Sequence, residues 1–398
     1  MFAIKKSVVW VAVLVAGAAV GTCTEAKDSS RDDSGADSGD TSGGDSDADV
    51  SSDSNTDTDS NAELCAATIF ERDFDDSNPS NDWSFFLGPI FEVPNTPSVP
   101  VYPWFPDGHI AVLAACDASP NWIMFWSEFE NYRSIGTSQF PEDQATLQPS
   151  GPVFGGRGNW DGYDNGGSWL MSVHRTSGNE LIGFYHAEDH WYPHTDNDIA
   201  WKSIGVTHSF DNGASWQTGA QIITSDQPKP LAPSWGGSGD NSVIWDWKND
   251  RWVCFFQESS LRLAISESHQ GEPGSWYKWN NGVFTEPGLG GMSDALPGLP
   301  HGANPSVHWN TYLKKWVMVY AGWNPANILI TASDDLVHWE QVRTVASSSV
   351  GGRAWYVTII GEDDNLAGQS AQLYYADIEP DFSSRQFVGR TITFERND

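Results

Sequence analysis

The stretch that decides the fold is Trp316-Val317-Met318-Val319-Tyr320 followed by Ile328-Leu329-Ile330-Thr331-Ala332-Ser333. It contains two short apolar strands and runs on, through a Ser-x-Asp turn, to Asp335 and Trp339. The same pair of strands recurs at 252–266 and at 181–207, and the latter leads into Ser209-Phe210-Asp211-Asn212-Gly213-Ala214-Ser215-Trp216. A recurrence of about 65 to 70 residues built from strands is typical of a β-propeller, whose radial sheets surround a channel. We therefore predict an all-β fold.

The number of repeats indicates a five-bladed β-propeller. Runs such as 110–113, 306–309 and 372–375 are rich in β-branched and aromatic residues and are bounded by turn formers. We place the blades at about 84–150, 160–220, 235–290, 300–345 and 350–398. We expect the segment around 66–70 to pair into the last blade, because joining the two ends removes an open sheet edge.

The first 23 residues have the layout of an export signal. Lys5 and Lys6 precede an apolar run from Val8 to Val20, which is too short to span a membrane. Val20-Gly21-Thr22-Cys23 resembles a bacterial lipoprotein cleavage box, so we predict lipidation of Cys23, with ordinary signal cleavage as the alternative. The chain is then exported and either lipid-anchored, at the bacterial cell surface or on a periplasm-facing membrane, or secreted.

An acidic linker follows at 24–63, before a propeller domain at 64–398. Between Thr24 and Asn61 the linker has 12 acidic and two basic side chains and almost no apolar ones, which predicts a disordered tether. It therefore carries 10 of the chain's 32 net negative charges. The remaining acidity argues against a nucleic acid partner and against a polyanionic sugar, whereas a neutral polysaccharide would not be repelled.

The four cysteines do not indicate a metal centre. If Cys23 is acylated, a disulfide between Cys65 and Cys116 remains open in an exported protein, and Cys254 in an apolar strand is expected to be a buried thiol. No spacing fits zinc. We predict no required cofactor and no catalytic metal, and leave a structural calcium open.

Strand order separates the acidic residues into two groups. Loops that enter an inner strand, or that join the second strand to the third, lie on one face of a propeller, and the hairpin between the third and fourth strands lies on the other. Asp211 and Asp335 belong to that hairpin, whose sequence matches the Asp box of sialidases and related propellers. We interpret both as structural, because Asp and Ser side chains bond to turn amides.

The opposite face collects the candidate catalytic carboxylates. Loops entering the inner strands supply Asp161, Asp164 and Asp240, and ends of second strands supply Glu188 and Glu258. Aligning the Asn that follows each makes Asp164 and Asp240 equivalent in neighbouring blades. Glycosidic cleavage requires an acid and a base with separated pKa values. We assign Glu188 as general acid and Asp164 and Asp240 as base and tuning group, with Asp161 and Glu258 in reserve, although Asp in Gly-rich turns is also an ordinary turn former.

Aromatic, imidazole and other polar side chains near these acids are the candidate substrate-binding groups. Sugar faces stack on aromatic rings, and histidines either bind hydroxyls, tune Glu188, hold a metal or cap a loop. The candidates are His186, His190, Trp191, Trp160, Trp235, His301, Asn304 and Arg353, together with Trp323 as a stacking ring. Most of the 21 tryptophans, such as Trp216 and Trp339, are expected to pack between blades.

The chain resembles the five-bladed propeller glycoside hydrolases that include arabinofuranosidases, xylosidases, levanases and invertases. The resemblance rests on His301-Gly302-Ala303-Asn304-Pro305-Ser306-Val307-His308-Trp309-Asn310, on 316–320, and on Ser333-Asp334-Asp335-Leu336-Val337-His338-Trp339, and it covers about 160–345. It implies two Asp and one Glu from separate blades as catalytic groups. The first blade lacks a clear motif and offers only Asp107 beside Gly108.

Three functions are compatible with these features. The first is a glycoside hydrolase, acting as a monomer on a neutral polysaccharide or oligosaccharide. The second is a non-catalytic carbohydrate-binding lipoprotein that keeps the aromatic rings without the acid. The third is a sialidase-like enzyme, which needs an arginine cluster where this chain has scattered arginines such as Arg157, Arg262 and Arg353.

Overall fold

The computed structural model describes residues 68–94, 107–115, 122–128, 130–147, 149–155, 162–191, 199–382 and 385–397. The predicted signal segment with Cys23, the acidic linker, and the cysteines Cys65 and Cys116 lie outside these ranges. So do two of the site candidates, Trp160 and Asp161.

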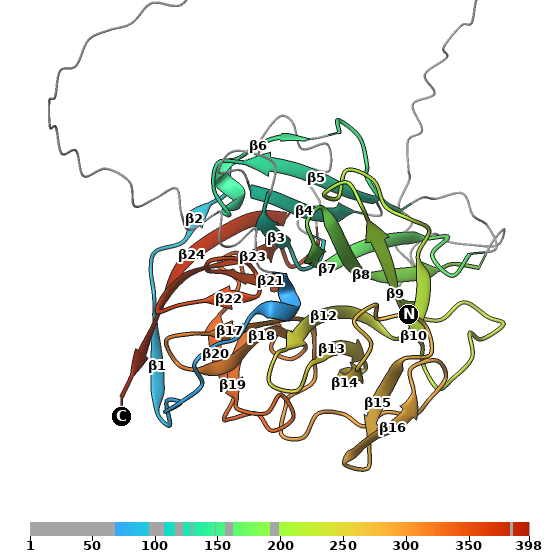
Figure 1. The fold of residues 1–398 in the computed structure, drawn as a ribbon. Helices are drawn as coiled ribbons and strands as arrows, with labels where there is room; N and C mark the ends of the chain where they lie inside the picture. The colour runs from blue at the N-terminus through green and yellow to red at the C-terminus, as the bar shows by residue number, and fades with distance from the viewer. Residues whose placement is uncertain are drawn as a thin grey trace, which may run out of the picture. The chain divides into compact units, whose positions relative to one another are not determined.

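The described residues form five sheets, antiparallel except where β11 and β22 add, that are arranged as the blades of a propeller, as predicted (Figure 1). Blade 1 contains β3 to β6 (Ala111–Ala114, Trp122–Glu128, Glu130–Gly136, Gln144–Leu147). Blade 2 contains β7 to β10 (Gly167–Ser177, Glu180–Asp189, Trp201–Ser209, Ala220–Ile223), with β11 (Gly236–Gly237) alongside β9. Blade 3 contains β12 to β16 (Gly239–Asp246, Arg251–Glu258, Ser260–Ser266, Trp276–Asn280, Val283–Pro287). Blade 4 contains β17 to β20 (Gly302–Asn310, Lys315–Gly322, Ile328–Ser333, Arg343–Ala346), with β22 (Leu366–Ala367) beside β17.

Blade 5 joins the two ends of the domain. It contains β21 (Arg353–Ile360), β23 (Ser370–Ile378) and β24 (Arg385–Arg396), and it is completed by β1 (Trp83–Leu87) and β2 (Phe91–Glu92). β1 pairs antiparallel with β24 from Trp83 opposite Arg396 to Leu87 opposite Ile392. The two ends therefore close the ring, as predicted, and the edge of β24 is covered.

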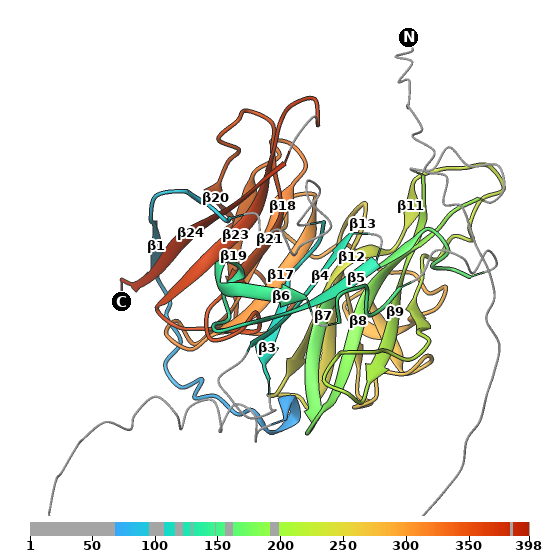
Figure 2. The same ribbon diagram turned by 90° about the horizontal axis from the view of Figure 1, so that it is seen from above.

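The prediction that the segment around 66–70 pairs into the last blade is wrong. Residues Ile69–Glu71 form a 3-10 helix, η1, and not a strand; the closing strand lies further along the chain, so blade 1 begins at 111 and not at 84. Phe70 packs edge-on against Trp245 with ring centroids 4.7 Å apart, and Arg72 pairs with Asp363 at 2.7 Å. These contacts hold η1 over one end of the channel, and η1 lies at the bottom of the view in Figure 2. We call this end the lower face and the end where the inner strands begin the upper face.

Hydroxyl groups tie the inner strands to one another. The Val243 amide donates to Ser172 Oγ at 2.9 Å, the Val307 amide to Ser242 Oγ at 3.2 Å, and the Ile110 amide to Thr358 Oγ1 at 3.0 Å. An inner strand is a sheet edge whose outward amides would otherwise be buried without acceptors. These bonds link blade 2 to blade 3, blade 3 to blade 4, and blade 5 to blade 1 along the channel.

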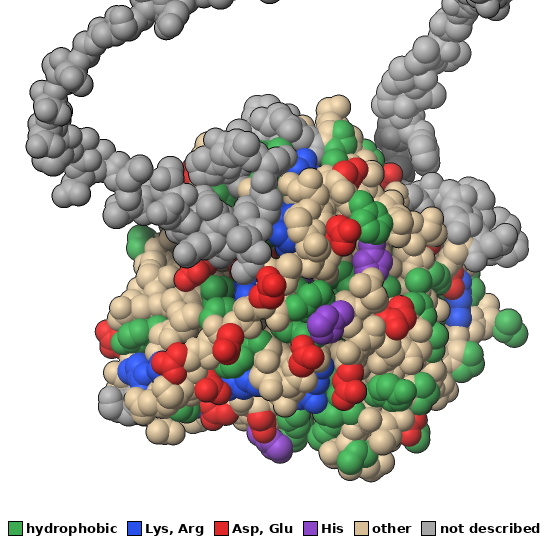
Figure 3. Space-filling model, in the orientation of Figure 1, with side chains coloured by type: hydrophobic (Ala, Val, Ile, Leu, Met, Phe, Trp, Pro, Cys, Tyr) green, Lys and Arg blue, Asp and Glu red, His purple; other side chains and the backbone are tan. Residues whose placement is uncertain are grey.

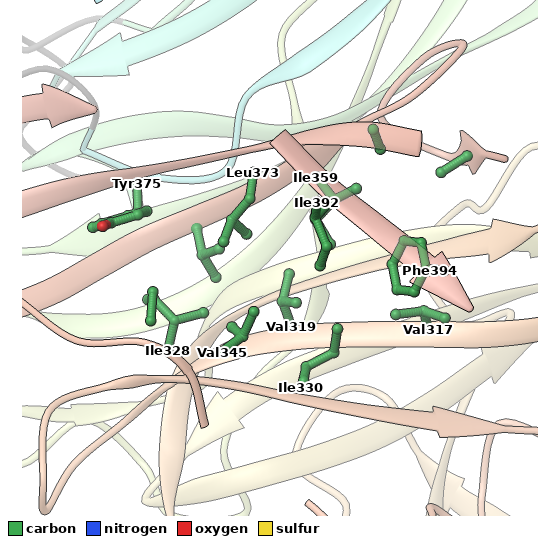
Figure 4. Close-up of a cluster of buried hydrophobic side chains, with 14 of the residues drawn as sticks. Val317, Val319, Ile328, Ile330, Val345, Ile359, Leu373, Tyr375, Ile392 and Phe394 are labelled. Carbon is green, nitrogen blue, oxygen red and sulfur yellow. The ribbon is translucent and has the colours of Figure 1, made fainter. Parts of the chain in front are cut away.

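Apolar cores lie between adjacent blades. Figure 4 shows the core of blades 4 and 5, where Val317 and Val319 of β18 lie close to Phe394 and Ile392 of β24. Tryptophans bridge other blades as predicted: Trp216 of blade 2 lies 5.6 Å from Phe125 of blade 1, and Trp339 of blade 4 lies 5.6 Å from Phe255 of blade 3. Blade-to-blade packing is thus carried by large rings.

The lower face carries turns with structural carboxylates. Asp211 accepts bonds from the amide and hydroxyl of Ser215, at 2.9 and 2.6 Å, and Asp335 accepts from the amides of Val337 and His338. Acidic side chains on the face that carries η1 are spread over several blades (Figure 3). Cys254 is buried, as predicted. None of the helices in the described ranges is long and apolar enough to cross a membrane.

Candidate functional site

Bulges shape the start of the inner strands at the upper face. The strand register shifts between Leu170 and Ser172 in β7 and between Gly239 and Asn241 in β12. Similar shifts lie in β17 and in β21, at 303–306 and 355–358. A bulge turns side chains away from the regular alternation, so residues there can project over the channel mouth. Asp240 lies inside one of these bulges.

His186 connects two of the predicted catalytic acids across blades. It lies on β8, and its Nε2 is 3.4 Å from Glu188 Oε1 while its Nδ1 is 3.2 Å from Asp240 Oδ1. The amide of Asp240 also approaches Nδ1, at 2.9 Å, so this nitrogen has a partner in either protonation state. His190 Nε2 lies 3.0 Å from the other oxygen of Glu188. Glu188 and Asp240 are therefore held on the two sides of one imidazole ring.

Asp107 brings a third carboxylate from blade 1. Arg385 Nη1 donates to its Oδ1 at 2.7 Å, and Trp169 Nε1 donates to its Oδ2 at 3.0 Å. The charge of Glu188 acts on Asp107, and the charges of Asp107 and Asp240 both act on Tyr356. The side chains of Asp107, Glu188 and Asp240 are 17%, 14% and 19% exposed, so each reaches solvent from a largely buried position. Three consecutive blades thus supply one carboxylate each.

The surroundings push the pKa values of these carboxyl groups apart. Burial raises the pKa of Asp107, more than Arg385 and Trp169 lower it. Burial also opposes ionisation of Glu188, but the bonds from His186 and His190 outweigh it and lower its pKa to about 2. The pKa of Asp240 is lowered as well, because His186 and the charge of Lys202 outweigh burial. For His186, burial is outweighed by Asp240 and Glu188, which raise its pKa to about 9.

The structure does not bring Asp164 and Glu258 into this carboxylate cluster. The hydroxyl bonds align Ser172 with Ser242, and Asp164 lies eight residues before Ser172 whereas Asp240 lies two before Ser242, so the predicted equivalence of the two acids is wrong. Asp164 lies in a turn before β7, where burial and then the charge of Asp189 raise its pKa. Glu258 pairs with Arg262 at 3.0 Å and accepts a bond from Ser238 at 3.2 Å.

The predicted substrate-binding residues are divided among several parts of the upper face. His301 Nδ1 lies 2.7 Å from Ser260 Oγ, and Asn304 is buried in the β17 bulge with a φ of 51°. Trp191 donates to the Pro230 carbonyl at 2.7 Å, and the Lys229 ammonium covers its ring at 4.5 Å. The indole N–H and the ring of Trp191 are therefore already engaged by Pro230 and Lys229.

Two further candidates, Trp235 and Arg353, also lie at the upper face. Trp235 is 57% exposed, and Arg353 stacks near Trp355 and Phe382. Arg353 begins β21, directly where the inner strand of blade 5 reaches the upper face. Both side chains are placed to contact a ligand that lies across this face.

Sequence reasoning missed several residues that support the cluster. Trp169 and Arg385 hold Asp107, and Lys202 donates to Gln257 Oε1 at 2.8 Å while acting on Asp240. Asp107 itself has a signal, since Asp107-Gly108 directly precedes the apolar inner strand of blade 1. A Cβ at position 108 would lie 2.8 Å from the end of the flexible Met171 side chain, so packing alone does not require glycine there.

The channel between the two faces is lined by buried histidines. Burial lowers the pKa of His109 and of His308 to about 3 and that of His174 to about 4, so these rings are neutral. His109 Nε2 lies 3.4 Å from Asp364 Oδ2. Within the part of the chain that the structure describes, no group of three or more His, Cys, Asp or Glu side chains is arranged to hold a metal ion.

Comparisons with known proteins give similarity only at the level of shape. No protein-family model and no curated protein matches the chain. A family 117 glycoside hydrolase from Zobellia galactanivorans is similar at 9% identity and a TM-score of 0.47, over 80% of this chain and 92% of that one. A GH62 α-L-arabinofuranosidase catalytic domain from Coprinopsis cinerea is similar at 12% identity and a TM-score of 0.45, over 79% of this chain and 98% of that one. An inulosucrase from Halalkalicoccus jeotgali is similar at 11% identity and a TM-score of 0.46, over 76% of this chain and 82% of that one. Because these TM-scores are below 0.5, function has to be inferred from the chain's own side chains.

Proposed function

We propose that this protein is a glycoside hydrolase whose site is the cluster of Asp107, Glu188 and Asp240. The observation that carries the proposal is the placement of one carboxylate from each of three consecutive blades on the upper face, with their pKa values moved in opposite directions. Such separation is what acid and base catalysis of glycosidic cleavage needs. The set of two Asp and one Glu is also what the resemblance to propeller glycoside hydrolases implies.

The surroundings of each carboxyl group suggest its role. Asp107, whose pKa is raised, is suited to hold a proton and pass it to the leaving oxygen. Glu188, whose pKa is lowered, is anionic and suited to activate water or attack carbon. This reverses the sequence-based role of Glu188, because imidazole nitrogens of His186 and His190 lie against its two carboxylate oxygens. Asp240 maintains the charge of His186 and thereby that of Glu188.

The proposed substrate is a neutral polysaccharide or oligosaccharide, hydrolysed outside the cytoplasm by an exported or lipid-anchored monomer. The net charge of −32 supports a substrate that is not a polyanion. A sialidase-like activity is disfavoured, because Arg262 is paired with Glu258 and Arg385 with Asp107. The carboxylate cluster likewise favours an enzyme over a binding protein that has lost its acid.

Release of reducing sugar from a panel of neutral glycans tests this function. Wild type is compared with Asp107→Asn, Glu188→Gln and Asp240→Asn, and with Asp211→Asn on the lower face as the matched control. We expect cleavage by wild type and by the control, and a loss of at least about 100-fold in kcat for Asp107→Asn and Glu188→Gln. Binding without cleavage by wild type would favour the non-catalytic alternative, and cleavage that survives both substitutions would place the site elsewhere.

A further inference from the structure

Exposed aromatic rings form a platform at the upper face of blades 4 and 5. Trp323 follows β18, and its ring centroid lies 5.9 Å from that of Trp355 on β21, with the planes at 81°. Phe382, which follows β23, lies 6.2 Å from Trp355. Trp323 and Phe382 are each 42% exposed. Large aromatic rings that cluster on a protein surface usually mark a contact site. We call Trp323, Trp355 and Phe382 the aromatic platform.

The guanidinium of Arg353 is held against this platform, and no carboxylate of the described residues pairs with it. It lies 4.8 Å from the Trp355 centroid and 4.9 Å from the Phe382 centroid. Several other arginines of the described chain pair with carboxylates, as Arg385 does with Asp107 and Arg251 with Asp246. Among the described residues, none accepts a hydrogen bond from the Arg353 side chain. Its N–H groups are therefore available to a ligand, in a chain with 53 acidic and 21 basic residues.

A continuous line of contacts joins the platform to the carboxylate cluster. The ring of Tyr356 lies 5.9 Å from that of Trp355, and the Arg385 guanidinium lies 5.0 Å over the ring of Tyr356. Arg385 in turn bonds to Asp107 at 2.7 Å. Tyr356 and Arg385 thus separate Arg353 and its platform from the proposed acid. The platform therefore lies beside the proposed site, on its blade 5 side.

We propose that Arg353 and the aromatic platform form a subsite for a sugar residue that carries one anionic group, a carboxylate or a sulfate ester. The sugar stacks on the exposed ring of Trp323, and its anionic group accepts hydrogen bonds from the Arg353 guanidinium, whose planar fork suits two oxygens at once. The inference rests on the proposed function and narrows its substrate. The glycan would consist mainly of neutral sugars and carry isolated acidic ones.

The acidity of the chain is compatible with this subsite. Long-range repulsion between exposed charges is screened over about 8 Å at physiological ionic strength, whereas the contact with Arg353 is direct. A polyanion would bring many charges within reach of the acidic surface, and a single substituent brings one. The overall charge and the local arginine therefore select the same kind of ligand.

Binding of small glycosides tests the subsite without any cleavage. Methyl β-D-glucuronide, glucose 6-sulfate and methyl β-D-glucoside are titrated into the full-length protein and followed by tryptophan fluorescence and calorimetry. We expect wild type to bind at least one anionic probe at least about tenfold more tightly than the glucoside, and the uronide and sulfate arms show which group is preferred. Arg353→Gln should bring all three affinities together, whereas Trp323→Ala should weaken all three alike.

The matched control is Arg390→Gln, because Arg390 lies on β24 and donates to the Gly88 carbonyl at 2.9 Å, away from the platform. It should keep the wild-type preference. Equal affinities of wild type for the charged and neutral probes, no binding of either anionic probe, or an unchanged preference in Arg353→Gln would overturn the inference. A protein that prefers the anionic probe yet cleaves no glycan would support the subsite and count against the hydrolase function.

Discussion

Replacing His186 by Phe tests the electrostatic arrangement at the centre of the site. Its ring is 6% exposed and lies between Glu188 and Asp240, which raise its pKa from 6.5 to about 9. That difference of about 2.5 pH units corresponds to roughly 3 kcal/mol of unfolding free energy, at about 1.4 kcal/mol per unit. The lowered pKa of Glu188 reflects the same contact, so its contribution is not added. Because the folded pKa is the higher one, this stability is complete below pH 6.5 and is lost as the pH rises through 9.

Urea unfolding of wild type and His186→Phe at pH 6 and pH 10, followed by tryptophan fluorescence, measures this contribution. We expect the advantage of wild type to be about 3 kcal/mol larger at pH 6 than at pH 10. His338→Phe is the control, because His338 is 77% exposed, and its difference from wild type should change little with pH. A wild-type advantage that is the same at both pH values would refute the charged state of His186.

Three further predictions concern the frame around the site. Arg72→Met should lower the free energy of unfolding, measured in urea titrations, by about 3 to 5 kcal/mol, because it leaves Asp363 buried and unpaired. Adding Asp363→Leu to the same chain should restore part of that free energy, and no recovery would contradict the ion pair. His308→Phe should raise the Tm relative to wild type at pH 4 but not at pH 8. Burial lowers the pKa of His308 to about 3, so wild type loses stability as the pH falls from 6.5 toward that value. An equal change in Tm at both pH values would rule this out. Phe394→Ala should cost about 3 to 5 kcal/mol in chemical denaturation, since the ring is fully buried where β24 meets blade 4, and a cost below about 1 kcal/mol would mean that this core does not hold the ring closed.

The fold was predictable from sequence because blades 2 to 4 repeat the same pair of strands. Blade 5 was harder, since β1 at Trp83–Leu87 pairs with β24 near the other end of the chain, and nothing local announces so distant a partner. The nearer apolar segment at Ile69–Glu71 has the composition of a strand, but its one ring, that of Phe70, packs against Trp245 and Trp252 at the lower face. A short apolar run does not reveal which surface will cover it.

The candidate site was predictable where strand order alone places a side chain. Glu188 and Asp240 follow from their positions at strand ends, and His186 from its place two residues before Glu188. Asp164 was misplaced because the two asparagines are not equivalent: Asn165 lies seven residues before Ser172, whereas Asn241 directly precedes Ser242, and the hydroxyl bonds align Ser172 with Ser242. The role of Glu188 depends on two imidazoles that meet its two oxygens, and such geometry is not encoded in spacing.

The central claim is that Asp107 and Glu188 act as acid and base of a glycosidase, and the leaving-group dependence of Asp107→Asn tests it most directly. The rate of this variant is measured on a natural glycan linkage and on an aryl glycoside of the same sugar whose phenolate leaves without protonation. The account predicts a loss of at least about 100-fold on the glycan and a much smaller loss on the aryl glycoside. Equal losses on both substrates, or full activity on the glycan, would contradict it.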